Sequence, residues 1–533
     1  MLSALAINGL LIVGALTLHS RWAGDTEVGE VCVVVLGAEL ASAASALSLV
    51  TSADASTAVD LGRFGPQDLQ WEVRMALVFD RLSNVFFCIL ATALVVCAAF
   101  LVEYFEYDFA GASITLLSAV FAQLAFVYFC SFDLFLLVFF WEAISMVSFF
   151  LVQHWSHRLT TYKAGLKVFF ISQLGDAPFL GFIFSALGWA GTSDMAAILG
   201  LAPVAQAYAV AVPAGGMVVG LPTLWGWLLV FTVLLKAAQF VFYPWLLDAM
   251  EAPVPISAQL HSSTLVVIGF YAYLRFLPLF EAVASVRLAL AAAGVWTTLY
   301  ASVLGFFQSD GKRLLACSTA SQLGYVAAGL GAGMVDEAVV MLAFCCCNKA
   351  VTFVWFGALM DRAGGVSDLR ALGGQAAPVW FEHAGLASAL ANFTVAPGAF
   401  SWHAKAVWST GHSAAAGSEA WARSLVIDVL ALAWLFSGAY LGYLYTSLFA
   451  APGRGPAVRR DSPRGPGKPA LAVLVGRLRH CASPWSGARA SAPFVAVMLA
   501  AQAVLAASPG QLPLTNLSEA GWAGSAASHS LFG

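Results

Sequence analysis

Apolar residues in this chain form long continuous runs that short polar segments separate. A run of about 18 or more apolar residues can cross the hydrocarbon core of a bilayer as a helix, and such runs recur along most of the chain. The pattern predicts an all-α polytopic membrane protein with about 14 transmembrane helices. The expected spans are residues 2–18, 31–50, 76–102, 111–130, 132–153, 162–188, 223–246, 256–279, 285–304, 314–333, 337–360, 379–409, 422–450 and 491–508.

Some segments between the spans have a different composition. Residues 51–75 are polar and are expected to form a loop. Residues 190–222 are apolar, but they contain too many glycines and prolines for a continuous helix. Residues 451–490 are rich in Pro, Gly and Arg and are predicted to form a basic loop. The span within 379–409 is expected to be interrupted near Pro397.

The composition agrees with a membrane protein. Of the 533 residues, 60% are hydrophobic and 10% are charged, whereas soluble domains have about 25% charged residues. The net charge of −4 is small and argues against a nucleic-acid partner. The nine cysteines show no metal-type spacing, so they are interpreted as small apolar residues. No basic region precedes the first apolar run, which argues against a cleavable signal.

Isolated ionisable residues inside the apolar runs are the candidates for function. A charged side chain at the bilayer centre costs roughly 2.5–3.5 kcal/mol on insertion scales, and such residues usually face the interior of the bundle and pair. The candidates are Glu142, Lys236, His261, Lys349 and Lys405, on five different predicted helices.

The stretch 231–261 is the strongest of these signals. It places Lys236 deep in an apolar run and follows it with Pro244, Pro253 and Pro255. A helix broken at membrane depth is tolerated only against other protein or a water-filled cavity. Burial disfavours the charged form of a lysine, and a carboxylate partner favours it. A carboxylate that moves between lysines would therefore change their proton affinity, which is the requirement for a pump.

Simpler explanations exist for each residue alone. A single lysine can form a structural salt bridge or extend to the membrane surface, and a single histidine is more often a satisfied buried residue than a relay. The whole set of lysines with a glutamate favours an ion path.

Several sequence blocks resemble one family. They are WEAISMVSFFL at 141–151, YKAGLKVFFISQLGD at 162–176, LLKAAQFVFYPWLLDAMEAPVPISAQLHSSTLV at 234–266, FFQSDGKRLLACSTASQLGYV at 306–326, NKA at 348–350 and PGAFSWHAK at 397–405. The chain is similar to the antiporter-like family that contains chain 5 of respiratory NADH–ubiquinone oxidoreductase (complex I) and the large subunits of Mrp-type cation/proton antiporters.

The resemblance implies a role for each matching residue. Glu142 corresponds to the glutamate that partners the lysine at Lys236. Asp176 corresponds to an acidic residue at the LGD block of the predicted helix 162–188. His261 and Lys349 correspond to members of a central hydrophilic axis. Lys405 corresponds to a lysine near the outlet, on a second broken helix.

The resemblance also implies a domain order. Two inverted five-helix repeats, each with a broken helix, are expected at 111–280 and 281–450, after three helices in 1–110. The basic loop 451–490 and a last helix with a tail in 491–533 would follow.

The sequence differs from the family pattern at three places. Gln173 stands where an arginine is usual, two or three residues before the aspartate of the LGD block. Cys345 and Met341 occupy positions one and two turns before Lys349, where histidines are usual. The lateral helix that usually follows is expected to be absent, reduced or carried by another polypeptide.

The resemblance implies a proton-translocating subunit without redox chemistry or a metal site of its own. NAD, FMN, iron–sulfur clusters and ubiquinone would be bound by the rest of the complex. The expected partners are a neighbouring antiporter-like subunit, accessory subunits and lipids such as cardiolipin. The expected location is the mitochondrial inner membrane, or alternatively a bacterial plasma membrane. An Mrp-type antiporter subunit and a non-pumping structural subunit are the alternative functions.

Overall fold

The computed structural model describes residues 57–64, 73–105, 110–206, 209–211, 218–362, 364–372, 433, 435–444 and 446–447. The predicted spans 2–18, 31–50, 379–409 and 491–508 lie outside these residues, as do Lys405, the predicted loop 451–490 and any lateral helix. Residues 435–444 are helical and lie within the predicted span 422–450.

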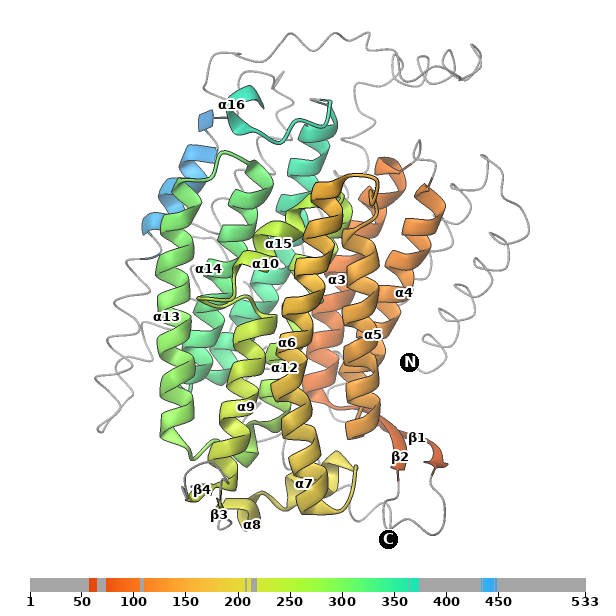
Figure 1. Ribbon diagram of the computed structural model, residues 1–533, viewed down its shortest axis with the longest axis vertical. Coiled ribbons are helices and arrows are strands. Elements are labelled where there is room, and N and C mark those ends of the chain that lie inside the picture. Colours follow the sequence, from red (N-terminus) through yellow and green to blue (C-terminus); the bar gives the residue numbers. More distant parts are fainter. Residues whose placement is uncertain are drawn as a thin grey trace, which may run out of the picture.

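Long, roughly parallel helices form the described part of the molecule (Figure 1). Six of the described helices are long and apolar enough to cross a membrane. Those six are α3 (Arg81–Tyr104), α4 (Gly111–Cys130), α5 (Leu134–Val152), α6 (Leu159–Ala190), α13 (Ala284–Phe306) and α15 (Val335–Arg362). A further long helix, α14 (Gly311–Gly331), is almost entirely buried between α13 and α15. These seven helices match seven of the predicted spans, and α4 has the predicted bounds.

Local sequence explains where the helices begin. Asp133 caps α5, because its carboxylate accepts hydrogen bonds from the backbone N–H groups of Phe135 and Leu136. Asp310 caps α14 in the same way by accepting from the Lys312 N–H group. Gly191, in a left-handed conformation, ends α6.

Two short antiparallel sheets correct the all-α prediction. Strand β1 (Thr57–Phe64) pairs with β2 (Val73–Phe79), and β3 (Ala209–Ala211) pairs with β4 (Val218–Gly220). The predicted loop 51–75 and the start of the predicted span 76–102 therefore contain strands. In β2, Leu77 and Phe79 are buried while the positions before each are half-buried, which is the two-residue period of a strand.

The strands lie at one end of the bundle with the short helices α7 (Met195–Gly200) and α8 (Ala202–Gln206) (Figure 1). The predicted non-helical segment 190–222 thus forms short elements there instead of a span. At the opposite end lies α16 (Leu369–Leu372) (Figure 1).

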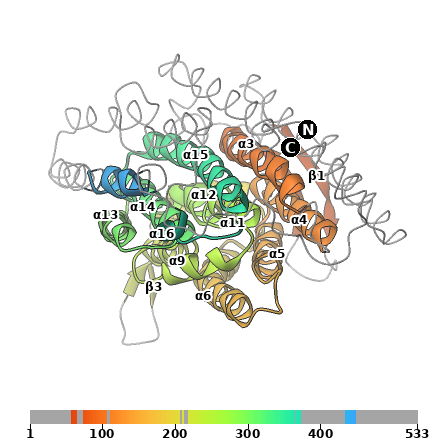
Figure 2. The ribbon, with the colours of Figure 1, turned by 90° about the horizontal axis from the view of Figure 1, so that it is seen from above.

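Interrupted helices form the centre of the described bundle. The predicted span 223–246 is divided into α9 (Leu221–Lys236) and α10 (Pro244–Asp248), with the 3-10 turn η1 (Ala249–Glu251) after it. The predicted span 256–279 is divided into α11 (Val254–Ser262), α12 (Ile268–Phe276) and the turn η2 (Leu277–Leu279). Every residue of α11 and α12 is buried, and Figure 2 shows these helices surrounded by the longer ones.

The second interruption corrects the prediction of a continuous helix at 256–279. Its cause is local, because the Thr264 hydroxyl donates to the backbone carbonyl of Gln259 at 2.8 Å, and Ser262 and Ser263 stand beside it. Short hydroxyl side chains compete in this way with helical hydrogen bonds.

A buried ion pair ties α12 to the start of α3. The Arg275 guanidinium contacts the carboxylate of Asp80, the residue that caps α3, and it also donates to the hydroxyls of Ser83 and Tyr271. Removing one partner of a buried pair usually costs about 3–5 kcal/mol. This contact therefore holds the central interrupted helix against the surrounding ring.

Candidate functional site

Helix α9 ends at Lys236, inside the bundle. Its 16 residues rise about 24 Å, which is less than the roughly 30 Å thickness of the hydrocarbon core. The chain cannot continue as a helix, because Ala238 (φ 49°) and Val241 (φ 76°) adopt left-handed backbone conformations. Lys236 is 1% exposed. The resemblance implied a discontinuous helix carrying Lys236, and the structure confirms it.

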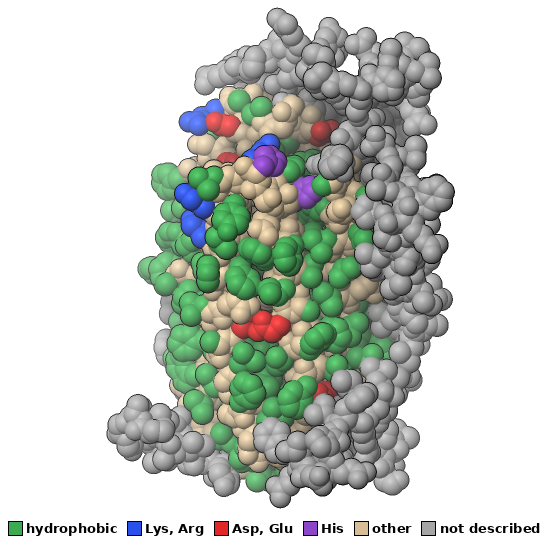
Figure 3. Space-filling view, turned by 45° about the vertical axis from the view of Figure 1, so that its right-hand side comes forward, with side chains coloured by type: hydrophobic (Ala, Val, Ile, Leu, Met, Phe, Trp, Pro, Cys, Tyr) green, Lys and Arg blue, Asp and Glu red, His purple; other side chains and the backbone are tan. Residues whose placement is uncertain are grey.

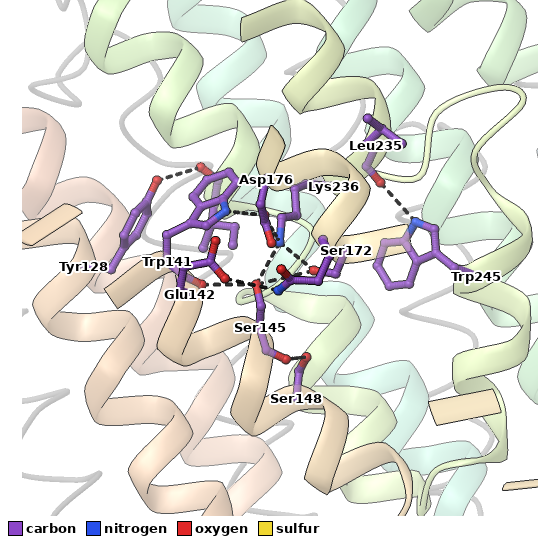
Figure 4. A network of polar contacts seen from close by, with 12 residues as sticks. Tyr128, Trp141, Glu142, Ser145, Ser148, Ser172, Asp176, Leu235, Lys236 and Trp245 are labelled. Atoms are coloured by element: carbon purple, nitrogen blue, oxygen red, sulfur yellow. Dashed lines mark hydrogen bonds and ion pairs between the residues drawn. The ribbon is translucent and has the colours of Figure 1, made fainter. Parts of the chain in front are cut away.

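The Lys236 ammonium forms an ion pair with Asp176 on α6. Its Nζ lies 2.7 Å from Asp176 Oδ1, and it donates to the hydroxyls of Ser145 at 2.8 Å and Ser172 at 2.5 Å. The Trp141 ring faces the ammonium, with 4.9 Å between Nζ and the ring centroid. Trp141 Nε1 also donates to Asp176 Oδ1 at 2.5 Å. Figure 4 shows these groups converging from α5, α6 and α9.

The direct partner of Lys236 is therefore Asp176 and not Glu142, which corrects the expected pairing. Glu142 is half-buried and accepts a hydrogen bond from Gln173 Nε2 at 3.1 Å. Successive helical residues point about 100° apart. Trp141 points into the bundle, and Glu142 lies at the edge of the network around Lys236 without contacting the ammonium (Figure 4).

Glu142 instead lies on an outward face of α5. We define the α5 outer face as Phe135, Phe139, Glu142, Met146 and Phe150, which recur every three or four residues. Phe139 is 63% exposed and Met146 is 47% exposed. Figure 3 shows a broad apolar surface on the described part of the molecule, with acidic atoms in its middle. A carboxylate in such a position needs a polar neighbour, because exposure to lipid is costly.

His261 lies in the last turn of α11, between two aromatic rings. The centroid of its ring is 6.2 Å from that of Trp245 and 6.4 Å from that of Phe353. Neither ring nitrogen has a hydrogen-bond partner among the described residues, and the side chain is buried. A buried imidazole of this kind is normally hydrogen-bonded, so water is the expected partner.

Lys349 lies fully buried in α15 and contacts α14. Its Nζ donates to the Ser318 hydroxyl and, at 3.5 Å, to the backbone carbonyl of Leu315. His261 and Lys349 face the same region, because Phe353 is one turn after Lys349 on α15 and lies beside His261.

The sequence did not reveal the hydroxyl and indole groups around the lysines. Ser172 precedes Asp176 by one turn, and Ser145 follows Trp141 by one turn. That spacing was a usable signal, because residues four apart share one face of a helix. Ser318 lies on a different helix from Lys349, and no local pattern connects them. Within the described residues, no three His, Cys, Asp or Glu side chains form a group that could bind a metal ion.

One protein-family model matches the central part of the chain. Residues 131–383 match the family described as NADH:quinone oxidoreductase/Mrp antiporter, TM. That range includes Glu142, Asp176, Lys236, His261 and Lys349.

Similar proteins are named as parts of respiratory complexes. The chain is 34% identical over 235 residues to NADH-ubiquinone oxidoreductase chain 5 of Cryptococcus neoformans, covering 44% of this chain and 34% of that one. It is 31% identical over 319 residues to the protein of the same name from Paramecium tetraurelia, covering 59% and 55%. NADH-quinone oxidoreductase subunit L of Mycobacterium tuberculosis is 33% identical over 251 residues, covering 46% and 38%. The matches thus span between a third and about half of these relatives.

A solved structure shares the fold. A chain in the structure of the Mrp complex from Dietzia sp. aligns with a TM-score of 0.68 and 24% identity, covering 83% of this chain and 46% of that chain.

Proposed function

We propose, from the match of residues 131–383 to the NADH:quinone oxidoreductase/Mrp antiporter family, that this chain is a proton-translocating membrane-arm subunit of NADH:ubiquinone oxidoreductase. It couples quinone reduction elsewhere in the complex to proton movement across the membrane. The names of the curated relatives support this assignment over other membrane transport classes.

The buried pair of Lys236 and Asp176, at the end of a helix that stops within the bundle, is the observation that carries the proposal. The ammonium has a carboxylate, two hydroxyls and an aromatic ring around it. Separation of the pair leaves the ammonium without its counter-charge in an apolar setting, which favours release of the proton. Return of the carboxylate favours uptake. Conformational change can thus drive proton transfer here.

The proton path runs from Lys236 through His261 to Lys349 and then to Lys405. His261 lies in the last turn before the second helix interruption, and Lys349 lies on the same side of α15 as the ring beside His261. Glu142 acts on Lys236 through space and not by contact. Its place on the α5 outer face makes it able to respond to a neighbouring subunit.

The chain performs no redox chemistry in this proposal. NAD, FMN, iron–sulfur clusters and ubiquinone bind to other subunits of the complex. The neighbouring antiporter-like subunit packs against the α5 outer face, where it shields the half-buried Glu142 carboxylate from lipid. Accessory subunits and lipids such as cardiolipin complete the surroundings. The location is the mitochondrial inner membrane, with a bacterial plasma membrane as the alternative.

The test is proton pumping by the intact complex carrying Lys236→Ala. We expect loss of most pumping and, through coupling, of NADH–quinone turnover, because the variant removes the group that exchanges the proton. Lys167→Ala is the matched control, since Lys167 forms an exposed ion pair with Asp248 that contributes about 0–1 kcal/mol. Pumping at the wild-type rate in Lys236→Ala would refute the proposal.

Purification of the native complex separates the two family functions. Co-purification of flavin and iron–sulfur proteins supports the respiratory assignment. A complex that exchanges cations for protons without those proteins would instead make the chain an Mrp-type antiporter subunit.

A further inference from the structure

Buried polar atoms gather at the two helix interruptions. The first interruption, 237–243, contains Gln239, and the second, 263–267, follows Ser262 and includes Ser263. Gln239 Oε1 and the hydroxyls of Ser262 and Ser263 have no hydrogen-bond partner among the described residues, and all three side chains are at most 2% exposed. Buried groups of this kind are normally bound to water.

Gln322 on α14 is a fourth such group. It is 1% exposed, and neither its Oε1 nor its Nε2 has a partner within the described part of the chain. A buried amide left without hydrogen bonds costs about 1–3 kcal/mol. The contacts described for Lys236, His261 and Lys349 do not involve this amide, so its presence in the core needs another explanation.

Contacts to Lys349 place Gln322 beside the proposed path. Ser318 accepts a hydrogen bond from Lys349 Nζ, and Gln322 follows Ser318 by four residues on α14. Residues four apart share one helical face, with about 5–6 Å between their Cβ atoms. Gln322 is therefore one turn from the residue that holds Lys349.

Contacts to α13 place Gln322 at the depth of the first interruption. Thr298 Oγ1 donates to the backbone carbonyl of Ser321 at 3.3 Å. The adjacent Thr297 Oγ1 accepts from the backbone N–H of Phe240 at 2.8 Å. Thr298 thus contacts the residue before Gln322, and the adjacent Thr297 contacts the residue after Gln239.

The turn of α15 opposite Gln322 contains the thiol of Cys345 and no histidine. Helices α14 and α15 are consecutive and antiparallel, and Ser318 contacts Lys349, so Gln322 lies opposite the turn of α15 that contains Cys345. A thiol is a weak hydrogen-bond donor and acceptor. The amide on α14 is the stronger polar group at this depth.

We propose that Gln322 binds the water through which a proton passes between the interrupted segment after Lys236 and Lys349. The amide is not protonated: Oε1 accepts a hydrogen bond from the water, and Nε2 donates one. The water accepts a proton on one side and releases another to the neutral Lys349 amine, so water and amide end unchanged. Gln322 is therefore a positioning residue, and its role rests on the proposed pumping function.

The variant Gln322→Met, in the whole complex, tests this role. Methionine has nearly the same length and volume but cannot hold the water, so the rate of proton pumping per assembled complex should fall about tenfold or more. The ratio of the pumping rates in H₂O and D₂O should rise above the wild-type value, because proton transfer becomes limiting. Gln322→His, which places a polar side chain at this position, should recover much of the rate.

Gln259→Met is the matched control. Gln259 is an equally buried amide on α11, but Ser118 satisfies both its oxygen and its nitrogen. This variant can lower the amount of assembled complex, but the isotope ratio should stay at the wild-type value. An isotope ratio that rises equally in both Gln→Met variants overturns the inference.

Lys236→Ala and Lys349→Ala, measured in the same assay, separate this inference from the proposed function. If both lysine variants pump normally, the proposed function is wrong. If both lose pumping while Gln322→Met pumps as wild type, only the role of Gln322 is wrong. If the Gln322→Met complex does not assemble, the Gln322→His complex is measured instead. A histidine that binds the water should keep the isotope ratio at the wild-type value. An isotope ratio above the wild-type value in Gln322→His would contradict the inference.

Discussion

At the scale of single residues, Asp176 sets the charge balance around Lys236. The substitution Asp176→Asn keeps the shape of the side chain but leaves the buried Lys236 ammonium without its counter-charge. Loss of one partner of a buried pair usually costs about 3–5 kcal/mol. We therefore expect the variant subunit to be less stable, with a clear fall in the temperature at which the purified complex loses activity.

Glu142→Gln is the control for this prediction. Glu142 is only half-buried, and Gln173 Nε2 hydrogen-bonds to it. The neutral amide can accept the same hydrogen bond, so the stability should change by less than about 1 kcal/mol. Pumping should still fall, because the charge near Lys236 is lost. Equal loss of thermal stability in the two variants would show that Asp176 is not the direct partner.

At the scale of elements, glycines bring α13 and α14 into backbone contact. A Cβ atom on Gly324 would lie 2.4 Å from Thr298 Oγ1 and 2.7 Å from the Gly294 carbonyl oxygen, and one on Gly294 would lie 2.4 Å from the Ala328 nitrogen. Small residues at such an interface permit close packing in membranes, where the hydrophobic effect does not drive helices together. The contact also fixes the position of α14, which contains Ser318.

Gly324→Ala should force α13 and α14 apart. Overpacking of this kind costs about 1–3 kcal/mol. We expect less assembled complex on native gels and a lower inactivation temperature.

Gly188→Ala on α6 provides the comparison, since no atom lies within 4 Å of a Cβ added there. Alanine favours a helix over glycine by about 1 kcal/mol, so this variant should be as stable as wild type or more so. Destabilisation by both substitutions would show that the close contact of α13 and α14 is not the cause.

At the scale of the whole molecule, the α5 outer face distinguishes one side of the bundle. It combines exposed apolar side chains with Glu142, which lies one turn before Met146. Lipid covers an apolar face without cost, but a carboxylate at this depth needs a polar partner. Within this chain Gln173 is that partner. The proposed function provides a neighbouring membrane subunit to cover the face, and a charge that it brings near Glu142 would couple the two chains electrostatically.

A photo-crosslinking residue tests that arrangement. Benzoylphenylalanine in place of Met146 should form a covalent product with the neighbouring antiporter-like subunit in the intact complex, identified by mass spectrometry. The same residue in place of Leu288 on α13, which is 57% exposed, should not give that product. Labelling of lipid alone at position 146 would contradict the interface.

Much of this arrangement could be predicted from the sequence. Long apolar runs determine membrane helices because an unpaired backbone group in lipid is too costly, and α4, α5, α6, α13, α14 and α15 follow the predicted runs closely. The isolated charges in those runs indicated the candidate functional residues for the same reason, since a charge in lipid requires a compensating partner. The apolar run around Lys236 and the prolines after it therefore predict both the depth of this lysine and the helix break beside it.

The tertiary structure decided which groups meet. Sequence spacing assigns residues to one face of a helix, but the rotation of α5 and α6 about their axes depends on packing against α9 and α11. That rotation turns Asp176 toward Lys236 and places Glu142 on the outer face of α5. The packing of α14 against α15 likewise brings Ser318 to Lys349. The interruption at 263–267 was missed because the Thr264 hydroxyl competes locally with helical hydrogen bonds. The strands were missed because residues 57–64 pair with residues 73–79, and no local pattern in the sequence shows that pairing.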